Sequence, residues 1–225
     1  KLNALARRGT VIVAKTDPPL ISVLAAWIAR WRGAGLVNWL QDVFPEVAVE
    51  LGMRVLRGPL GTWARVFRDA SLRAAVANVT LGERMAERIR TRGIDSSAIK
   101  VIPNWADGEA ITPLASDLNP LRAEWNLRNK FVVMYSGNMG RAHELGPIVD
   151  AAEALRHEAS LVFLLVGGGA GRASLEREVA AKKLPNVLFR PYQPRNQLRH
   201  SLTLGDVHLA ALKPELEGLI VPSKA

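Results

Sequence analysis

The sequence predicts an α/β protein that contains two parallel β-sheets. Short apolar runs rich in valine and isoleucine alternate with helix-like segments along most of the 225 residues. These runs are continuous rather than interleaved with polar residues, as expected when helices cover both faces of a parallel sheet. The alternation is interrupted over residues 103–120, where prolines stand among Asp, Asn and Ser residues. We therefore expect two α/β units, residues 1–104 and 105–225, joined by a linker.

The first unit opens with the apolar run "TVIVAKT", which is followed by a helix-like segment. Its last predicted helix ends at Gly93, after Arg88, Arg90 and Arg92. Basic side chains favour the C-terminal turn of a helix, and glycine commonly terminates it. The predicted strands lie at 10–16, 35–42, 74–80 and 99–104, and the predicted helices at 18–31 and 82–92.

The second unit restarts the same alternation with "KFVVMYSG". The next apolar run, "SLVFLLVGGG", ends in three glycines, and "NVLFRPY" ends in proline and tyrosine. The predicted strands lie at 130–137, 160–169, 186–192 and 206–212, and the predicted helices at 143–157, 172–182 and 195–202.

The overall composition is that of a soluble globular chain, with 48% hydrophobic and 23% charged residues. No cysteine is present, which excludes disulfides and thiolate metal sites, and the four histidines have no metal-ligand spacing. The longest apolar run, 18–29, is too short to span a bilayer. The net charge of +9 is consistent with an anionic partner, or with solubility alone.

A loop of small residues ends the first strand of the second unit, at Ser136-Gly137-Asn138-Met139-Gly140. Ligands of open parallel sheets bind at the carboxyl ends of strands, where helix N-termini present unpaired N–H groups. Gly137 and Gly140 would allow a phosphate to approach the backbone closely. Neither the P-loop nor the dinucleotide fingerprint is present, so the loop is either a binding site or only a tight turn.

Two further loops, 166–172 and 190–197, close the next strands at the same predicted edge of the sheet. A fourth segment, 212–224, places Lys213, Glu215, Glu217 and Lys224 among apolar residues. Lysine ammonium groups suit a diphosphate, and a glutamate can accept hydrogen bonds from sugar hydroxyls. The alternative for this segment is a solvated charged loop.

Asp42 ends a predicted strand in the first unit and is followed by Pro45 and Glu46. It could contact a nucleophilic hydroxyl, or serve as the N-cap of a helix, which is the commoner use of aspartate at such a position. No Gly-x-Ser-x-Gly sequence is present, which argues against a serine hydrolase.

Residues 50–73 form an arginine-rich segment with aromatic side chains. Trp63, Val66 and Phe67 share one predicted helical face, with Arg65, Arg68 and Asp69 elsewhere. Two interpretations stay open: a helix that lies in a membrane interface, or a core-facing helix with its arginines in water.

Several stretches together resemble one protein family. They are "KTDPPL", "QDVFPE", "VIPNWAD", "MYSGNMGRAHEL", "VGGGAGR", "FRPYQPRNQL" and "LEGLIVPSK", in this order. The chain resembles bacterial glycosyltransferases of family 4, the retaining GT-B type, and within it the colanic-acid and O-antigen branch that includes N-acetylfucosamine transferases. The resemblance implies two Rossmann-like domains that face a cleft, with the acceptor bound by the first and the nucleotide-sugar by the second. We expect both domains to be incomplete here and the excerpt itself to be inactive.

The resemblance also implies roles for individual residues. Glu217 resembles the first of two glutamates that bound the donor loop; Ala225 stands eight residues later, so the second glutamate either lies beyond this excerpt or is absent from this branch. Gln41 stands where many relatives have a histidine before Asp42. We expect Glu217 and Asp42 to be the catalytic residues. The expected donor-binding residues are Ser136, Gly137, Asn138, Gly140, Arg141, His143, Gly167, Gly168, Tyr192, Lys213 and Lys224.

The expected reaction transfers a sugar from a nucleoside-diphosphate sugar to a lipid-linked saccharide acceptor in surface polysaccharide biosynthesis. No Asp-x-Asp motif is present, so no cofactor and no obligatory metal are expected. We expect a cytoplasmic protein, with peripheral attachment to the anionic inner face of the bacterial plasma membrane as a further option. The alternatives are a nucleotide-sugar epimerase of the same fold class and a basic nucleic-acid-binding protein, although no aromatic-basic recognition motif supports the latter, and nucleic acid is not an expected partner.

Overall fold

The computed structural model describes residues 2–222, which divide into two compact units. The first unit runs up to Asn104 and also includes Pro214–Val221; the second comprises Trp105–Lys213 with Pro222. The break after Asn104 coincides with the predicted one. The prediction placed residues 214–221 in the second unit, but they pack with the first unit. The cause is hydrophobic: Leu216 and Leu219 are buried there, and Leu219 accepts a backbone hydrogen bond of 2.8 Å from Val43.

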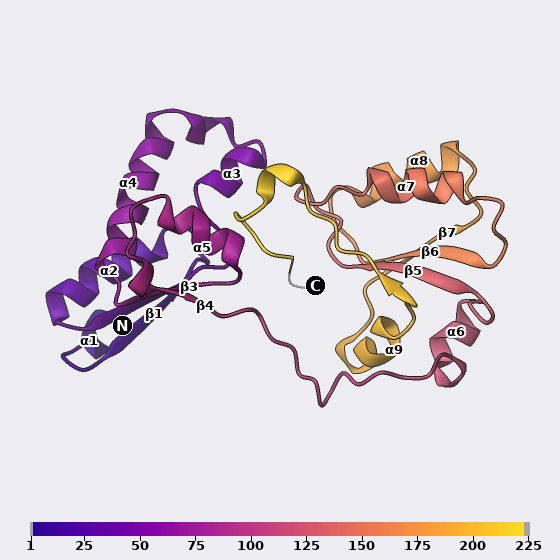
Figure 1. The fold of residues 1–225 in the computed structure, drawn as a ribbon, viewed down its shortest axis with the longest axis horizontal. Coiled ribbons are helices and arrows are strands. Elements are labelled where there is room, and N and C mark those ends of the chain that lie inside the picture. The colour runs from indigo at the N-terminus through magenta and orange to yellow at the C-terminus, as the bar shows by residue number, and fades with distance from the viewer. Residues whose placement is uncertain (1, 223–225) are drawn as a thin grey trace. The chain divides into compact units, whose positions relative to one another are not determined.

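The first unit is built on a parallel sheet with the strand order β1-β2-β3-β4 (Figure 1). Adjacent strands are consecutive in the chain and are joined by helical crossover connections, as parallel pairing requires. The strands are β1 (Val11–Lys15), β2 (Gly35–Trp39), β3 (Ala77–Thr80) and β4 (Ile99–Val101). The helices are α1 (Leu2–Leu5), α2 (Ile21–Arg32), α3 (Glu46–Glu50), α4 (Pro59–Ala74) and α5 (Glu83–Arg90), with 3₁₀ turns at Arg54–Arg57, Ser96–Ala98 and Pro214–Leu216.

Only one face of β1 is covered by the described residues. Ile12 and Ala14 pack in a core with Ala25, Ile28 and Leu36, whereas Val11, Val13 and Lys15 are exposed. The expectation of two covered faces is therefore wrong for this strand. β1 lies at the edge of the sheet, where α2 supplies contacts on a single side.

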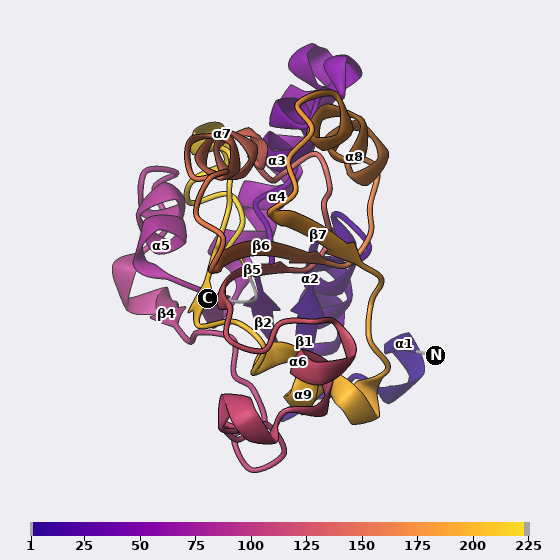
Figure 2. The same ribbon diagram turned by 90° about the vertical axis from the view of Figure 1, so that its right-hand side faces the viewer.

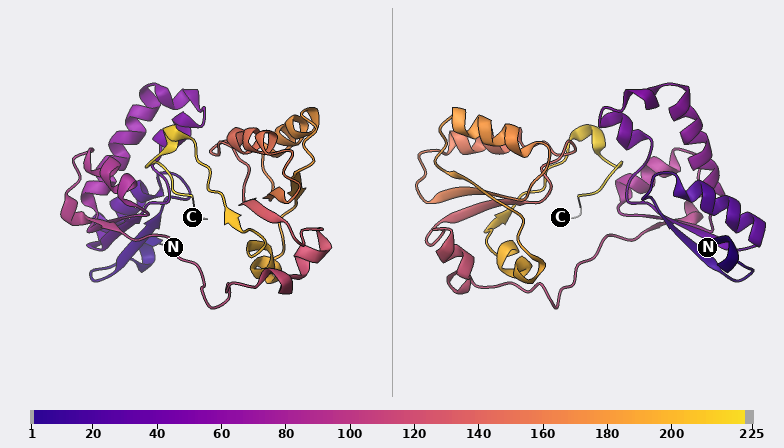
Figure 3. Two further views of the ribbon diagram at one scale, coloured as in Figure 1. Left: turned by 45° about the vertical axis from the view of Figure 1, so that its right-hand side comes forward. Right: turned by 180° about the vertical axis from the view of Figure 1, so that it is seen from behind.

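The second unit is built on a parallel sheet with the order β7-β6-β5-β8. Helices α7 and α8 lie on one face of this sheet and α6 and α9 on the other (Figures 1 and 3). The strands are β5 (Phe131–Ser136), β6 (Leu161–Val166), β7 (Val187–Arg190) and β8 (Val207–His208). The helices are α6 (Pro120–Glu124), α7 (Gly146–Ala154), α8 (Arg172–Ala181) and α9 (Leu198–Leu202), with 3₁₀ turns at Ser116–Leu118 and Arg195–Gln197.

The central strand β6 shows why its sequence is apolar without interruption. Figure 2 shows β7, β6 and β5 side by side. Val162 and Leu164 pack on the side of α6, while Phe163 and Leu165 pack against α7 and α8. Successive side chains of a strand point to opposite faces, and here both faces are buried. The prediction of a strand covered on both sides is confirmed for β6.

The linker and the first helix of the second unit differ in detail from the prediction. Residues 102–115 contain no helix or strand, but a 3₁₀ turn and α6 occupy 116–124. Helix α7 begins at Gly146 rather than 143, because Pro147 occupies its first turn, where a residue without an N–H group is favoured. The loop 136–140 is therefore not at the N-terminus of that helix.

Candidate active site

The loops that follow β5, β6 and β7 meet at the carboxyl edge of the second sheet, as predicted. The backbone N–H of Gly137 donates to Val166 at 2.8 Å, and that of Gly167 to Arg190 at 2.9 Å. Met139 donates to Gly168 at 2.6 Å and accepts from Gly171 at 2.8 Å. The three loops thus form one hydrogen-bonded cluster, which provides a rigid edge for a ligand.

Glycine is required where these loops touch. Gly167 has φ +134°, and a Cβ atom built on it would lie 2.0 Å from the carbonyl oxygen of Gly137. Gly169 has φ +132°, and its Cβ would lie 2.3 Å from Oδ1 of Asn138. No side chain fits at either position. Gly137 and Gly167 therefore allow the two loops to pack closely together. The sequence alone does not distinguish this structural role from ligand binding.

Tyr135 and Arg172 secure this cluster from two sides, and sequence reasoning assigned neither. The hydroxyl of Tyr135 donates to the carbonyl of Asn138 at 2.8 Å. Burial, together with the nearby Tyr192, raises the pKa of Tyr135 to about 12, so the hydroxyl keeps its proton for this bond. Arg172 donates through Nη1 to the carbonyls of Gly167 and Arg190. The only feature of the sequence that pointed to Arg172 was its position directly after the glycine-rich loop.

The side chain of His143 is anchored to the backbone of a neighbouring segment. Its Nδ1 lies 2.6 Å from the carbonyl oxygen of Ala211, and a carbonyl only accepts, so Nδ1 carries the proton. The backbone N–H of Lys213 donates to Ala142 at 3.0 Å, which brings Lys213 beside this segment.

Fewer polar groups are accessible to a ligand at this edge than the set of predicted donor-binding residues would provide. The N–H groups of Asn138 and Gly140 make no hydrogen bond to any described residue. The side chains of Asn138, Arg141 and Tyr192 are exposed, and Lys213 is half-buried. The ring of Tyr192 lies beside Gly168, within 3.5 Å of the position a Cβ would take there. Ser136 lies at the end of β5, and Lys224 lies outside the described residues.

The two predicted catalytic residues belong to the first unit. Glu217 and Asp42 both pair with Ile220 through isolated β-bridges. The carboxylate of Glu217 is exposed and lies 3.2 Å from Nε of Arg84, while its carbonyl accepts from Arg88 at 2.8 Å. The structure therefore brings Glu217 to Asp42 and assigns it to a different unit from Lys213 and the 136–140 loop.

Asp42 is not a helix cap. Pro45 occupies the N-cap of α3 and makes no side-chain capping bond, so that alternative is wrong. Asp42 lines a small cavity with Thr16 and Phe44, and its Oδ1 is buried without a hydrogen-bond partner among the described residues. Burial raises the pKa of Asp42 and nearby Asp17 adds to the rise, while a hydrogen bond with Thr16 opposes it. A buried carboxylate with an unused oxygen is suited to accept a proton from a bound hydroxyl.

We expect Asp42→Asn to be more stable than the wild type at neutral pH. Because the native pKa is raised, the folded state holds this proton more tightly than the unfolded chain does. The wild type therefore loses stability as pH rises from the ordinary value of 3.8 through the native pKa, and the asparagine variant does not. Urea unfolding across pH measures the difference, which should vanish below pH 3.8. A difference that does not change with pH would contradict the raised pKa.

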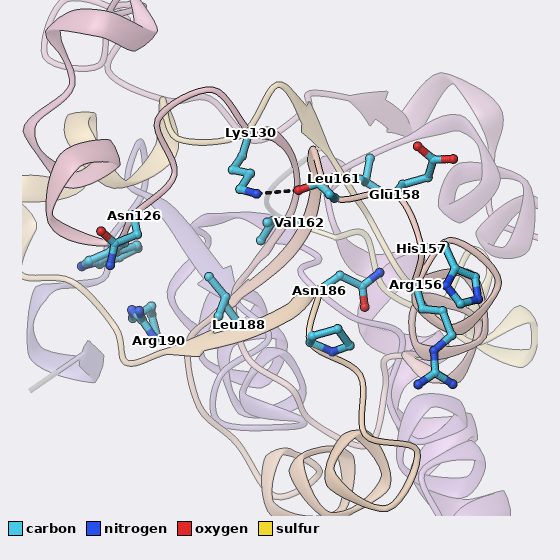
Figure 4. Close-up of a pocket in the computed structure, with 13 residues that line it drawn as sticks. Asn126, Lys130, Arg156, His157, Glu158, Leu161, Val162, Asn186, Leu188 and Arg190 are labelled. Atoms are coloured by element: carbon cyan, nitrogen blue, oxygen red, sulfur yellow. Dashed lines mark hydrogen bonds between the residues drawn. The ribbon is translucent and has the colours of Figure 1, made fainter.

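A cavity of the second unit lies away from this edge. It has a volume of about 510 Å³ and is lined by residues before β5, β6 and β7, including Lys130, Glu158 and Asn186 (Figure 4). Lys130 donates to Ala159 at 2.5 Å, and Asn186 donates to Ala152 at 2.8 Å. These bonds tie together the amino ends of the strands, where open parallel sheets do not usually bind ligands. We therefore place the candidate site at the carboxyl edge.

Two further observations on the described residues concern metal ligands and membrane spans. No group of three or more His, Cys, Asp or Glu side chains among them is arranged to hold a metal ion. None of their helices combines the length and the apolar character that crossing a bilayer requires.

Solved structures with the same architecture define the class of protein. The chain superimposes on Anabaena HepE in complex with UDP-glucose with a TM-score of 0.68 and 20% identity, over 88% of this chain and 52% of that one. It also matches the sucrose-phosphate synthase of Thermosynechococcus elongatus with a TM-score of 0.65 and 19% identity, over 88% and 49%. The fold is that of the GT-B class, with Rossmann-like parallel sheets.

Two curated proteins are similar to the chain in sequence. A protein of Escherichia coli (strain K12) named as a colanic acid biosynthesis glycosyl transferase, WcaI, is 30% identical over 201 residues, which are 88% of this chain and 49% of the relative. The Pseudomonas aeruginosa protein WbjE, named as a glycosyltransferase, is 28% identical over 229 residues, which span 100% of this chain and 56% of the relative. No family model matches the chain. Both relatives support the resemblance to bacterial family 4 glycosyltransferases of the colanic-acid type, and the chain spans about half the length of these curated relatives.

Proposed function

We propose that the protein transfers a sugar from a nucleoside-diphosphate sugar to a lipid-linked saccharide acceptor in bacterial surface polysaccharide biosynthesis. The second unit binds the donor and the first unit binds the acceptor. The observation that carries this proposal is the cluster of loops after β5, β6 and β7, with the open N–H groups of Asn138 and Gly140 and with the backbone of Lys213 bonded to Ala142 beside it. The complexes of the HepE structures with UDP and UDP-glucose support a nucleotide-sugar as the donor.

The proposed reaction is a substitution at the anomeric carbon. The acceptor oxygen forms a bond to that carbon, the bond from the carbon to the diphosphate oxygen breaks, and the acceptor hydroxyl passes its proton to the carboxylate of Asp42. Lys213 and the N–H groups of Asn138 and Gly140 stabilise the negative charge that develops on the leaving diphosphate. Glu217 orients the sugar, and Asp42 contacts the acceptor hydroxyl. We further propose that the anomeric configuration is retained and that no metal ion is required.

Titration of the chain with UDP tests donor binding by the second unit. We expect Lys213→Ala to weaken binding about tenfold, because it removes a cation from the diphosphate, a loss of roughly 1.4 kcal/mol. Lys100→Ala provides a matched control, since Lys100 is an exposed lysine on β4 of the first unit and should not affect affinity. Isothermal titration calorimetry gives both constants. Equal affinities for the two variants would remove Lys213 from the site.

Transfer itself is tested with the full-length protein and a purified lipid-linked acceptor. The expected product keeps the anomeric configuration of the donor, which nuclear magnetic resonance can assign, and forms equally well with a chelator present. Glu217→Gln should lower transfer strongly and leave UDP binding unchanged. Conversion of the donor to an epimer in the absence of acceptor would instead favour the epimerase alternative.

A further inference from the structure

Helix α4 exposes the residues that a helix of a globular protein normally buries. Leu60, Trp63, Val66 and Phe67 are each at least half exposed, with Trp63 at 62% and Phe67 at 50%. Val55, in the 3₁₀ turn just before the helix, is exposed as well. We call these five residues the α4 apolar surface. The interpretation of α4 as a core-facing helix with its arginines in water is wrong.

The buried side of α4 explains how this inverted arrangement is stable. Gly61, Ala64, Arg68, Ser71 and Leu72 face the first unit. A Cβ on Gly61 would lie 1.8 Å from the carbonyl oxygen of Leu56, so the helix approaches the preceding turn more closely than any side chain would allow. Arg68 and Ser71 satisfy their polar groups through hydrogen bonds inside the unit. The packing of α4 therefore uses Leu72 but not Leu60, Trp63, Val66 or Phe67.

Trp63 and Phe67 lie one helical turn apart and form a pre-arranged pair. Their ring centroids are 6.0 Å apart with an angle of 26° between the planes. Aromatic rings on one face of an interfacial helix insert at the boundary between headgroups and acyl chains. Because the pair is already ordered, little side-chain freedom is lost when it inserts.

Cationic side chains border the α4 apolar surface. Arg54 and Arg57 are exposed and make no ion pair with a described residue, and Arg65 bonds only the hydroxyl of Thr62 among the described residues. The acidic groups nearby are Asp69, which pairs with buried Arg68, and Glu50, at the end of α3. Free arginines beside exposed aromatic rings match anionic lipid headgroups, each contributing roughly 1 kcal/mol near such a surface.

We propose that the α4 apolar surface docks the protein peripherally on an anionic lipid bilayer. Trp63 and Phe67 enter the interface while Arg54 and Arg57 contact phosphate headgroups. This inference deepens the proposed function by naming the membrane surface at which a lipid-linked acceptor would be met. It does not depend on sugar transfer, because vesicle binding is measured without donor or acceptor, so each proposal can fail separately.

Vesicle flotation of the 225-residue chain tests the proposal. We expect binding to vesicles of phosphatidylcholine mixed with phosphatidylglycerol and weak binding to phosphatidylcholine alone. The double variant Trp63→Ser/Phe67→Ser should bind at least tenfold more weakly, and Arg54→Glu/Arg57→Glu should lose the preference for phosphatidylglycerol. All four side chains are exposed, so circular dichroism and the urea midpoint should not change.

Helix α2 offers a matched control. Trp27 and Trp31 are each 62% exposed and lie one turn apart, but the guanidinium of Arg32 lies over Trp31 at 5.0 Å and also donates to Asn3. We expect Trp27→Ser/Trp31→Ser to keep most of the vesicle binding. Equal loss in the α2 and α4 variants would overturn the assignment to α4. A dimer in sedimentation that dissociates when Trp63 and Phe67 are replaced would show that the surface binds a second copy of the chain instead.

Discussion

Replacing Arg68 with leucine is expected to destabilise the first unit by about 3–5 kcal/mol. Arg68 is only 4% exposed and donates to both carboxylate oxygens of Glu46, at 3.0 and 3.1 Å. It also donates to Asp69 at 2.6 Å and to the carbonyl of Phe44 at 2.9 Å. Leucine would leave two largely buried carboxylates without their principal cation, and Arg92 reaches only Glu46, at 2.8 Å.

Urea unfolding followed by tryptophan fluorescence measures this effect. Trp27, Trp31, Trp39 and Trp63 all lie in the first unit, so the signal reports mainly on that unit. Arg65→Leu is the matched control: Arg65 lies on the same helix, is half-exposed and has only a 3.2 Å bond to Thr62 among the described residues. Its expected change is within about 0.5 kcal/mol. A loss below 1 kcal/mol for Arg68→Leu would mean that the carboxylates find other partners.

Replacing Gly167 with alanine is expected to abolish detectable UDP binding and to destabilise the second unit by several kcal/mol. The φ of +134° alone costs an L-residue roughly 1–3 kcal/mol. The added methyl would also meet the Gly137 carbonyl at 2.0 Å, and a backbone atom cannot move aside without breaking the bond between Gly137 and Val166. Overpacking of this kind costs a further 1–3 kcal/mol or so.

Gly168→Ala is the control for this variant because it differs by one position. Gly168 has no positive φ, and its Cβ would meet only the ring of Tyr192, at 3.5 Å. We expect nearly unchanged stability and a modest change in UDP affinity. Thermal unfolding and calorimetry of both variants provide the comparison. Similar behaviour of the two variants would contradict the close approach of the loops after β5 and β6.

The features of the fold that depend on residues close together in the sequence could be predicted, whereas those that depend on the position of an element in the sheet could not. The run "LVFLLV" indicated a strand buried on both sides, and β6 is one, because the period-two alternation of its side chains between two cores follows from backbone geometry. The start of α7 was placed three residues early, although Pro147 was visible in the sequence. β1 reads like β6 in its apolar character, yet its edge position leaves Val11 and Val13 exposed.

The candidate site shows the same division. The loop sequences indicated which strand ends carry small residues, and a parallel sheet necessarily brings those ends to one edge. The local sequence does not indicate that the N–H groups of Gly137 and Gly167 donate to the ends of the neighbouring strands. Nor does it indicate that Nδ1 of His143 donates to the carbonyl of Ala211. These bonds join residues that lie far apart in the sequence.

The amino-acid sequence by itself determined the alternation of strands and helices, the parallel sheets, the break after Asn104 and the family resemblance. Each of these depends on short-range periodicity or on the order of motifs along the chain. Only the tertiary structure decided that residues 214–221 pack with the first unit, that Asp42 is half-buried with an Oδ1 atom unpaired among the described residues, and that α4 buries Arg68 while it exposes Trp63. The physical reason is that burial and hydrogen-bond pairing depend on which distant residues arrive beside a side chain, and helical periodicity identifies a face without stating which way it points.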